Sequence, residues 1–157
     1  MEIEFITKKI EETKKLGRLL AQELRGGEVV CLFGELGAGK TTFTQGLLEG
    51  LKVEKPYTSP TFIVMKEYKV KNNRGKGINK KEIDAVYHFD AYRVGIEDIL
   101  NLGWEEITTN EKNICVIEWA DKLKKIIPSK SLWVSFEWLD EEKRKIIIRE
   151  KFQKIQK

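Results

Sequence analysis

The spacing of hydrophobic residues along the chain predicts an alternation of helices and strands. Hydrophobic residues recur mostly at helical spacing within Ile10–Leu24, and Gly26 and Gly27 are expected to end that helix. Val29–Phe33 is a continuous hydrophobic run of strand length, which is typical of a parallel strand buried on both faces. A second helix is expected over about Lys40–Leu51. The first third of the chain therefore indicates helix, buried strand, helix.

The rest of the chain continues this α/β alternation. Residues with high strand propensity predict strands at Thr61–Val70, Ala85–Asp90 and Ile114–Trp119. Helices are expected at Ile96–Asn101 and at Ala120–Ile127, before Pro128. Leu132–Leu139 and Lys145–Phe152 flank a charged turn and predict an antiparallel hairpin. We expect a mixed, mostly parallel sheet flanked by helices in one domain, residues 1–157.

A phosphate-binding motif lies between the buried strand and the second helix. Residues 34–41 read GELGAGKT, which matches the P-loop pattern of Gly, four residues, then Gly-Lys-Thr. Backbone N–H groups of such a loop and the helix N-terminus bind phosphates, while the lysine reaches the β and γ phosphates and the threonine hydroxyl binds Mg²⁺. This predicts a P-loop NTPase-like fold that binds a nucleotide with Mg²⁺. The expected nucleotide contacts here are Gly34, Glu35, Gly37, Ala38, Gly39, Lys40, Thr41 and Thr42.

Hydrolysis needs an acidic residue near the metal, and Glu118 is the candidate. It follows the hydrophobic run Ile114–Ile117, so it lies at the carboxyl end of a predicted strand, where ligands of open α/β sheets bind. We interpret this run as a Walker B strand with Glu in place of Asp, which makes Thr41 and Glu118 the expected Mg²⁺ ligands. The alternative is that Glu118 caps the next helix.

Asp90 ends another predicted strand, in the sequence VYHFD. It would lie at the same edge of the sheet and is a candidate to position water or accept a proton, so we group it with Lys40 and Glu118 as catalytic. A turn-capping role is the alternative. His88 lies two residues earlier and points to the same face of a strand, but packing is the preferred interpretation for this histidine.

Composition adds little to this picture. The formal charge is +4, from 29 Lys and Arg against 25 Asp and Glu, and a solubilising surface is the simpler interpretation of the basic clusters. Cys31 and Cys115 each lie in a hydrophobic run, without metal-ligand or disulfide spacing. No stretch resembles a signal or a membrane span, so a reducing cytoplasm is the expected location.

Five segments follow one another along the chain: the P-loop, YTSPTF at 57–62, VYHFDAYR at 86–93, LGWEE at 102–106 and VIEW at 116–119. Together they resemble the TsaE (YjeE) family, the ATPase component of tRNA threonylcarbamoyladenosine biosynthesis. The resemblance covers about Gly27–Ala120. It implies a protein that binds and slowly hydrolyses ATP and associates with TsaD and TsaB, TsaD carrying out the transfer to tRNA.

The resemblance also implies roles for individual residues. Thr61, in the SPTF segment, would sense the γ phosphate, and Trp119 would belong to the nucleotide site, although on propensity alone Trp119 is a core aromatic. The chain departs from the usual family pattern in a longer basic insertion at about residues 71–85. Whether the insertion contacts tRNA or a partner stays open.

Three other functions compete with this interpretation. A small-molecule kinase would use the same P-loop with Asp90 as the base, but the arginines are scattered along the sequence rather than grouped in a lid. For a GTPase, the nearest guanine-reading motif is Asn79-Lys-Lys-Glu82, within a polar loop. A nucleotide-gated assembly subunit overlaps with the family expectation.

Overall fold

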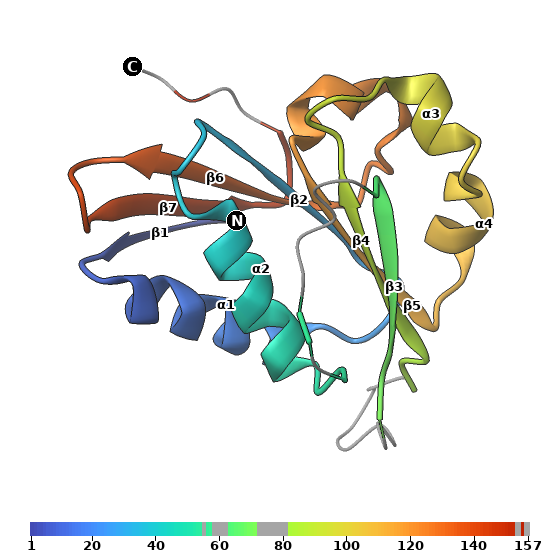
Figure 1. Cartoon of the computed structure of the whole chain (residues 1–157), viewed down its shortest axis with the longest axis horizontal. Helices are drawn as coiled ribbons and strands as arrows, with labels where there is room; N and C mark the ends of the chain where they lie inside the picture. Colours follow the sequence, from blue (N-terminus) through green and yellow to red (C-terminus); the bar gives the residue numbers. More distant parts are fainter. Residues whose placement is uncertain (55, 58–62, 72–81, 153–154, 156–157) are drawn as a thin grey trace.

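The computed structural model describes residues 1–54, 56–57, 63–71, 82–152 and 155. In this part of the chain, seven strands form one sheet in the order β1-β7-β6-β2-β5-β4-β3. The strands are β1 (Glu2–Thr7), β2 (Val29–Gly34), β3 (Met65–Lys69), β4 (Ala85–Asp90), β5 (Asn113–Glu118), β6 (Leu132–Trp138) and β7 (Arg144–Arg149). Their order places the strand that precedes the P-loop at the centre of the sheet (Figure 1).

The sheet is mixed, and its centre is parallel. Strands β6, β2, β5 and β4 run parallel, whereas β3, β7 and β1 pair antiparallel at the two sides. Parallel central strands suit the hydrophobic runs of β2 and β5, because both faces of such strands are buried. The register pairs Glu118 with Leu32 on one side and with Asp90 on the other. The carboxyl ends of β2, β5 and β4 therefore meet at one edge, as the expected P-loop NTPase-like fold requires.

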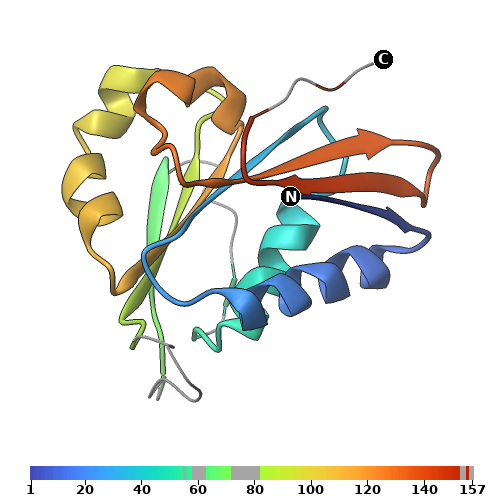
Figure 2. The same ribbon diagram turned by 180° about the vertical axis from the view of Figure 1, so that it is seen from behind.

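Helices cover both faces of the sheet (Figures 1 and 2). Helices α1 (Ile10–Glu23) and α2 (Lys40–Gly50) pack on one face, while α3 (Ile96–Leu100), α4 (Trp104–Thr109) and the 3-10 helix η1 (Ala120–Ile126) pack on the other. Successive residues of a strand point to opposite faces. Val116 accordingly lies in the cluster under α1 and α2, and Ile117 in the cluster under α3, α4 and η1.

The structure confirms most predicted elements and adds or corrects three. Strand β1 was not predicted, and it pairs with β7 through partners such as Phe5 and Ile146. Helix α4, which begins after the left-handed Gly103, was also not predicted. The helix expected at Ala120–Ile127 is instead a 3-10 helix with a kink at Leu123. It ends before Ile127, whose extended backbone is the conformation favoured before proline.

Both cysteines are buried, and burial raises the pKa of the Cys115 thiol to about 12 and that of Cys31 as well. They pack as small hydrophobic groups, as expected. None of the described helices is both long and hydrophobic enough to cross a membrane. Residues 72–81, the greater part of the basic insertion, lie outside the described residues.

Candidate nucleotide-binding site

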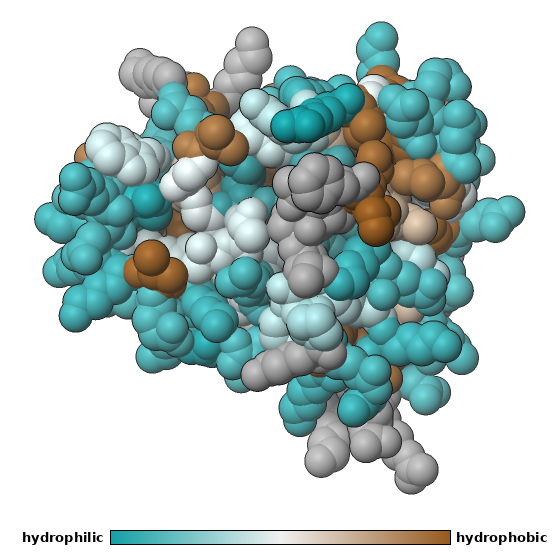
Figure 3. Space-filling model, in the orientation of Figure 1, coloured by the Kyte–Doolittle hydropathy of each residue, from teal (hydrophilic) through white to brown (hydrophobic). Residues whose placement is uncertain are grey.

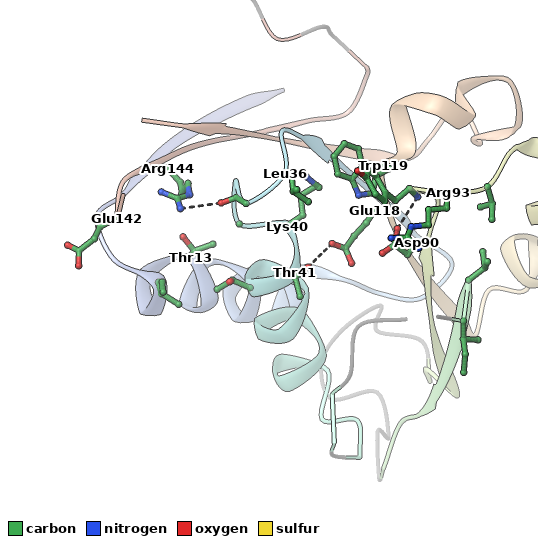
Figure 4. Close-up of a pocket in the computed structure, with 18 residues that line it drawn as sticks. Thr13, Leu36, Lys40, Thr41, Asp90, Arg93, Glu118, Trp119, Glu142 and Arg144 are labelled. Carbon is green, nitrogen blue, oxygen red and sulfur yellow. Dashed lines mark hydrogen bonds between the residues drawn. The ribbon is translucent and has the colours of Figure 1, made fainter. Parts of the chain in front are cut away.

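A pocket of about 800 Å³ opens where the central strands end. The P-loop leaves β2, Glu118 ends β5 and Asp90 ends β4, so three neighbouring parallel strands direct their carboxyl ends to this pocket. This is the edge where open α/β sheets bind ligands. Figure 4 shows Asp90, Glu118 and Trp119 on one side of the loop, with Thr13, Glu142 and Arg144 on the other.

The mouth of the pocket carries exposed hydrophobic side chains. Leu36 at the tip of the P-loop is 77% exposed, Ile63 is 66% exposed and Tyr92 is 45% exposed. The face seen in Figure 3 is otherwise mainly hydrophilic, with hydrophobic residues gathered near α3. Exposed hydrophobic groups beside a functional pocket are typical of contact with a ligand or a protein.

The Lys40 side chain folds back over its own loop. Its Nζ donates to the carbonyl oxygens of Gly34 at 2.7 Å and Glu35 at 2.9 Å, and it lies 4.0 Å from the centre of the Trp119 ring. Lys40 is only 5% exposed, and this burial lowers the pKa of its ammonium group. A weakly hydrated cation at the end of a P-loop attracts polyphosphate strongly.

Glu118 is buried at the side of the pocket that faces the P-loop. Its Oε1 accepts a hydrogen bond from Thr41 Oγ1 at 3.0 Å, and its Oε2 lies 2.6 Å from His88 Nε2. The two partners come from α2 and β4, and Glu118 is 2% exposed. The helix-capping alternative for Glu118 has no support in these contacts, because both carboxylate oxygens bond side chains of other elements.

Asp90 lies beside Glu118 but bonds elsewhere. Its Oδ1 accepts the backbone N–H of Tyr92 at 3.0 Å, which is the turn-capping contact considered from sequence. Burial raises the pKa of the Asp90 carboxyl, and the nearby Glu118 charge acts in the same direction. One oxygen therefore holds the turn, while the side chain still lines the pocket.

Trp119 adopts a backbone conformation that is rare for its residue type. Its φ is 62°, in the left-handed region, and its ring centre lies 4.8 Å from that of Tyr92. Such backbone strain is common at functional sites. The ring also packs against the cluster under α3, α4 and η1, so Trp119 serves both the core and the pocket.

Sequence reasoning missed Arg144. This side chain comes from the start of β7 and donates to the Gly37 carbonyl oxygen at 3.2 Å, while also bonding the carbonyls of Asp140 and Lys143. It therefore fastens the β6–β7 turn to the P-loop. Arg93 lines the same pocket from the β4 side, so two of the scattered arginines reach the site. No local motif marked Arg144, because hairpin pairing brings it there, whereas Arg93 ends the segment VYHFDAYR.

Most predicted site residues lie together. Those that line the pocket are Gly37, Gly39, Lys40, Thr41, Thr42, Asp90, Glu118 and Trp119. Gly34 and Glu35 border a second groove beside η1 and β6, and Ala38 is fully buried. Thr61 lies outside the described residues, so its role stays a prediction.

The donors beside the P-loop suit Mg²⁺ better than a metal held by protein alone. Within the described ranges, no three or more His, Cys, Asp or Glu side chains form a metal-binding group. Thr41 Oγ1 and Glu118 Oε1 instead offer one hydroxyl and one carboxylate at the end of a phosphate loop. Magnesium in nucleotide sites takes one or two such ligands and completes its shell with phosphates and water. The residues present therefore fit a nucleotide-bound Mg²⁺.

Comparison with known proteins places the chain in a family. The family model described as threonylcarbamoyl adenosine biosynthesis protein TsaE matches residues 7–146. The chain belongs to the TsaE family. Proteins named tRNA threonylcarbamoyladenosine biosynthesis protein TsaE are similar to it, at 36% identity in Bacillus subtilis over 87% of this chain and 78% of that protein. The Aquifex aeolicus protein is 38% identical over 94% of this chain and 96% of its own length.

A solved structure of the family has the same fold. The crystal structure of Bacillus subtilis YdiB superposes with a TM-score of 0.73 at 30% identity, covering 94% of this chain and 84% of that one. The resemblance seen in the sequence is therefore confirmed at the level of TsaE family and fold. The pocket residues from Ile10 to Arg144 all fall within the matched range.

Proposed function

We propose that this chain is a Mg²⁺-dependent ATPase that serves tRNA N6-threonylcarbamoyladenosine biosynthesis together with TsaD and TsaB. The observation that carries the proposal is the hydrogen bond of 3.0 Å between Thr41 and Glu118 beside the P-loop. It joins the two side chains that a P-loop hydrolase needs at its metal, although they lie 77 positions apart in the sequence.

The P-loop and Lys40 would hold the triphosphate. Gly39 has a left-handed backbone and precedes α2, whose N-terminal N–H groups and dipole favour an anion. Lys40 Nζ, now bound to two loop carbonyls, would exchange them for the β and γ phosphate oxygens. This exchange costs little, because the carbonyls belong to the same loop and the ammonium is already largely desolvated.

Thr41 and Glu118 would hold Mg²⁺, and Asp90 would act on the attacking water. The ion supplies positive charge against the phosphate oxygens on which negative charge builds. Asp90 has the attributes of a general base, because burial raises the pKa of its carboxyl toward the working pH. Its turn contact through Oδ1 leaves Oδ2 to orient a water molecule.

The nucleoside would occupy the part of the pocket on the far side of the P-loop from Asp90 and Glu118. Beyond Thr42 the pocket continues between α1 and the β6–β7 turn, where Ile10 is 71% exposed and Arg144 borders the loop. An exposed isoleucine offers an apolar contact for a base, and an arginine offers charge and hydrogen bonds for a ribose or phosphate. We propose this part of the pocket for adenosine.

The assignment to tRNA modification comes from the family. The similar proteins of Bacillus subtilis and Aquifex aeolicus carry that role in their names, and the resemblance implies that TsaD performs the transfer to adenosine. The exposed side chains of Leu36, Ile63 and Tyr92 at the pocket mouth suit contact with a partner protein. We propose that tRNA is reached through this complex.

Reconstitution tests the function directly. The chain is combined with TsaD, TsaB, tRNA and the enzyme that supplies threonylcarbamoyl-adenylate, and modified tRNA is followed over many cycles. We expect accumulation beyond one cycle only when this chain and hydrolysable ATP are present. Equal accumulation without the chain would refute the proposed function.

ATP turnover by the chain alone separates this proposal from a kinase. We expect weak hydrolysis that rises when TsaB and TsaD are added. Arg93 and Arg144 do reach the pocket, but Arg144 is bound to three backbone carbonyls rather than free to close over a phosphate. Efficient phosphorylation of a small metabolite by the isolated protein would favour the kinase instead.

A further inference from the structure

The contact between His88 and Glu118 stands out among the polar contacts of the core. His88 Nε2 and Glu118 Oε2 lie 2.6 Å apart, and the two side chains are 2% and 3% exposed. His88 sits on β4, where its register partner in β5 is Val116, so it reaches diagonally to the end of the neighbouring strand. This distance is that of a strong hydrogen bond to a carboxylate.

The surrounding groups define which imidazole nitrogen carries the hydrogen. Glu118 accepts from Thr41 at Oε1 and, as a carboxylate, has only acceptor capacity left at Oε2. His88 Nδ1 is buried and has no hydrogen-bond partner among the described residues. A hydrogen on Nδ1 would leave a buried donor unpaired and set the Nε2 lone pair against a carboxylate oxygen. The hydrogen therefore belongs on Nε2, pointing at Glu118.

We propose that His88 is a positioning residue for the magnesium-binding carboxylate, holding Glu118 Oε2 so that Oε1 faces Thr41. This inference rests on the proposed function and adds a residue to it. Rotation of a carboxylate about its last bond is otherwise loosely restrained, whereas Mg²⁺ requires a strict ligand geometry. With one oxygen held from β4 and the other from α2, the plane of the carboxylate is fixed.

Packing alone does not explain this histidine. A core position on β4 would be filled as well by leucine, and the neighbouring Val86 on the same face is a plain hydrophobic residue. The imidazole instead leaves one nitrogen without a partner in the described structure while it bonds the pocket carboxylate. A positioning role accounts for both features: the unpaired Nδ1 costs free energy of folding, and the Nε2 contact holds the carboxylate. Removing such partners of metal ligands commonly weakens metal affinity by about 10- to 100-fold.

Two substitutions separate the hydrogen bond from the packing. His88→Leu keeps an apolar side chain of similar size but has no donor, whereas His88→Gln places an amide N–H near the position of Nε2. Binding of a fluorescent ATP analogue to the full chain is measured first in EDTA and then over a Mg²⁺ titration. We expect metal-free binding within about twofold of wild type for both, since the P-loop is untouched.

The Mg²⁺ midpoint is the decisive quantity. For His88→Leu we expect it to rise by about 10-fold or more, and for His88→Gln to stay within about threefold of wild type. A wild-type midpoint for His88→Leu, or an equal rise for both variants, would overturn the positioning role. Thermal unfolding of each variant is compared to confirm that the chain is folded.

A double substitution asks whether His88 acts through Glu118. In a Glu118→Gln background, adding His88→Leu should shift the Mg²⁺ midpoint by less than about twofold, because the carboxylate it positions is already gone. A full additional shift would mean that His88 acts by another route and would contradict the proposal.

Nuclear magnetic resonance gives a test that does not depend on nucleotide. His88 is the single histidine of the chain, so its imidazole nitrogens give one unambiguous pair of signals. We expect a proton on Nε2 in wild type, and loss of the hydrogen-bonded signal in Glu118→Ala, which has no acceptor at this position. A hydrogen on Nδ1 with none on Nε2 would refute the inference. Absence of any Mg²⁺-dependent nucleotide binding by wild type would instead refute the proposed function, so the two failures are distinguishable.

Discussion

The two walls of the proposed nucleotide pocket are built in different ways. The phosphate wall is one continuous segment, residues 34–41, in which Lys40 bonds carbonyls five and six positions away. The metal wall joins Thr41 to a carboxylate 77 positions away, and that carboxylate to a histidine 30 positions away. Backbone geometry makes the first wall, whereas sheet register and strand order make the second.

This difference determines what each wall tolerates. Atoms of a continuous loop are set by local dihedral angles, so a side chain that forces a different backbone disturbs it directly. Side chains that converge from separate strands depend on pairing over the whole sheet, and on each other, so their substitution affects chemistry more than folding. The following experiments test this contrast.

The largest effect is expected on turnover, at the metal wall. Glu118→Gln removes a metal-binding charge while keeping the side-chain volume, so ATP hydrolysis should fall by about 1000-fold. Nucleotide binding in EDTA should persist, because the phosphate wall is intact. Steady-state phosphate release measures the loss. Glu106→Gln, an exposed change on α4, is the control, and turnover of Glu118→Gln at the control rate would remove Glu118 from the metal site.

The next effect is expected on folding, at the phosphate wall. Gly34 has φ of +146°, and a Cβ there would lie 2.3 Å from the Phe136 carbonyl oxygen. Gly34→Ala should therefore lower the free energy of unfolding by about 3 kcal/mol. At Gly37 φ is also positive, but a Cβ would meet no atom within 4 Å. Gly37→Ala should cost only about 1 kcal/mol, and urea denaturation that found the two variants equal would contradict the steric argument.

A smaller effect is expected where the chain fastens the phosphate wall to the β6–β7 turn. Arg144→Ala loses the contact with the Gly37 carbonyl and should weaken nucleotide binding about fivefold, without moving the Mg²⁺ midpoint. Arg149→Ala, which loses an ion pair with Glu2 further along β7, is the matched control. Isothermal titration calorimetry measures the nucleotide affinity of each variant. Equal affinities for Arg144→Ala and Arg149→Ala would show that Arg144 does not contribute to the site.

The smallest effect concerns the pH dependence of stability at Asp90. Burial raises the pKa of this carboxyl, so the folded protein holds the proton more tightly than the unfolded chain does. Ionisation therefore lowers the free energy of unfolding as pH rises from the ordinary Asp value through the folded value. Asp90→Asn keeps the oxygen that accepts from Tyr92 and removes this penalty.

Asp90→Asn should thus be more stable than wild type by less than about 1 kcal/mol near neutral pH, because Asp90 is only half-buried. The gain should vanish by about pH 3, where the carboxyl is protonated in both states. Urea denaturation at the two pH values measures the difference. If the stability advantage of Asp90→Asn over wild type increased toward low pH, the Asp90 pKa would be lowered by folding rather than raised.

The sequence predicted the phosphate wall in full, because a strand, a glycine-rich turn and a helix follow one another there. It also placed Asp90 and Glu118 at strand ends, since the end of a hydrophobic run marks the end of a buried strand. It could not show that His88 touches Glu118, because that contact depends on β4 and β5 being neighbours in the observed register. Arg144 was missed for the same reason, since a hairpin turn brings it to the loop.

The elements that escaped prediction have weak local signals. Strand β1 alternates charged and hydrophobic residues, but two of its three hydrophobic residues, Ile3 and Ile6, are 40% and 48% exposed, so tertiary pairing with β7 decides its structure. Helix α4 is only six residues long and contains two threonines. The 3-10 form of η1 depends on the left-handed turn at Trp119, which no sequence pattern marked.

The position of β2 in the sheet also governs the order of events during synthesis. This strand leaves the ribosome well before its hydrogen-bonded neighbours, which are β5 at Asn113–Glu118 and β6 at Leu132–Trp138. A nascent chain that ends before these residues carries the run VVCLF with neither edge paired, which is a segment prone to aggregation. The phosphate loop is thus synthesised about 80 to 100 residues before the strands that support it, and it acquires its sheet only when β5 and β6 have followed.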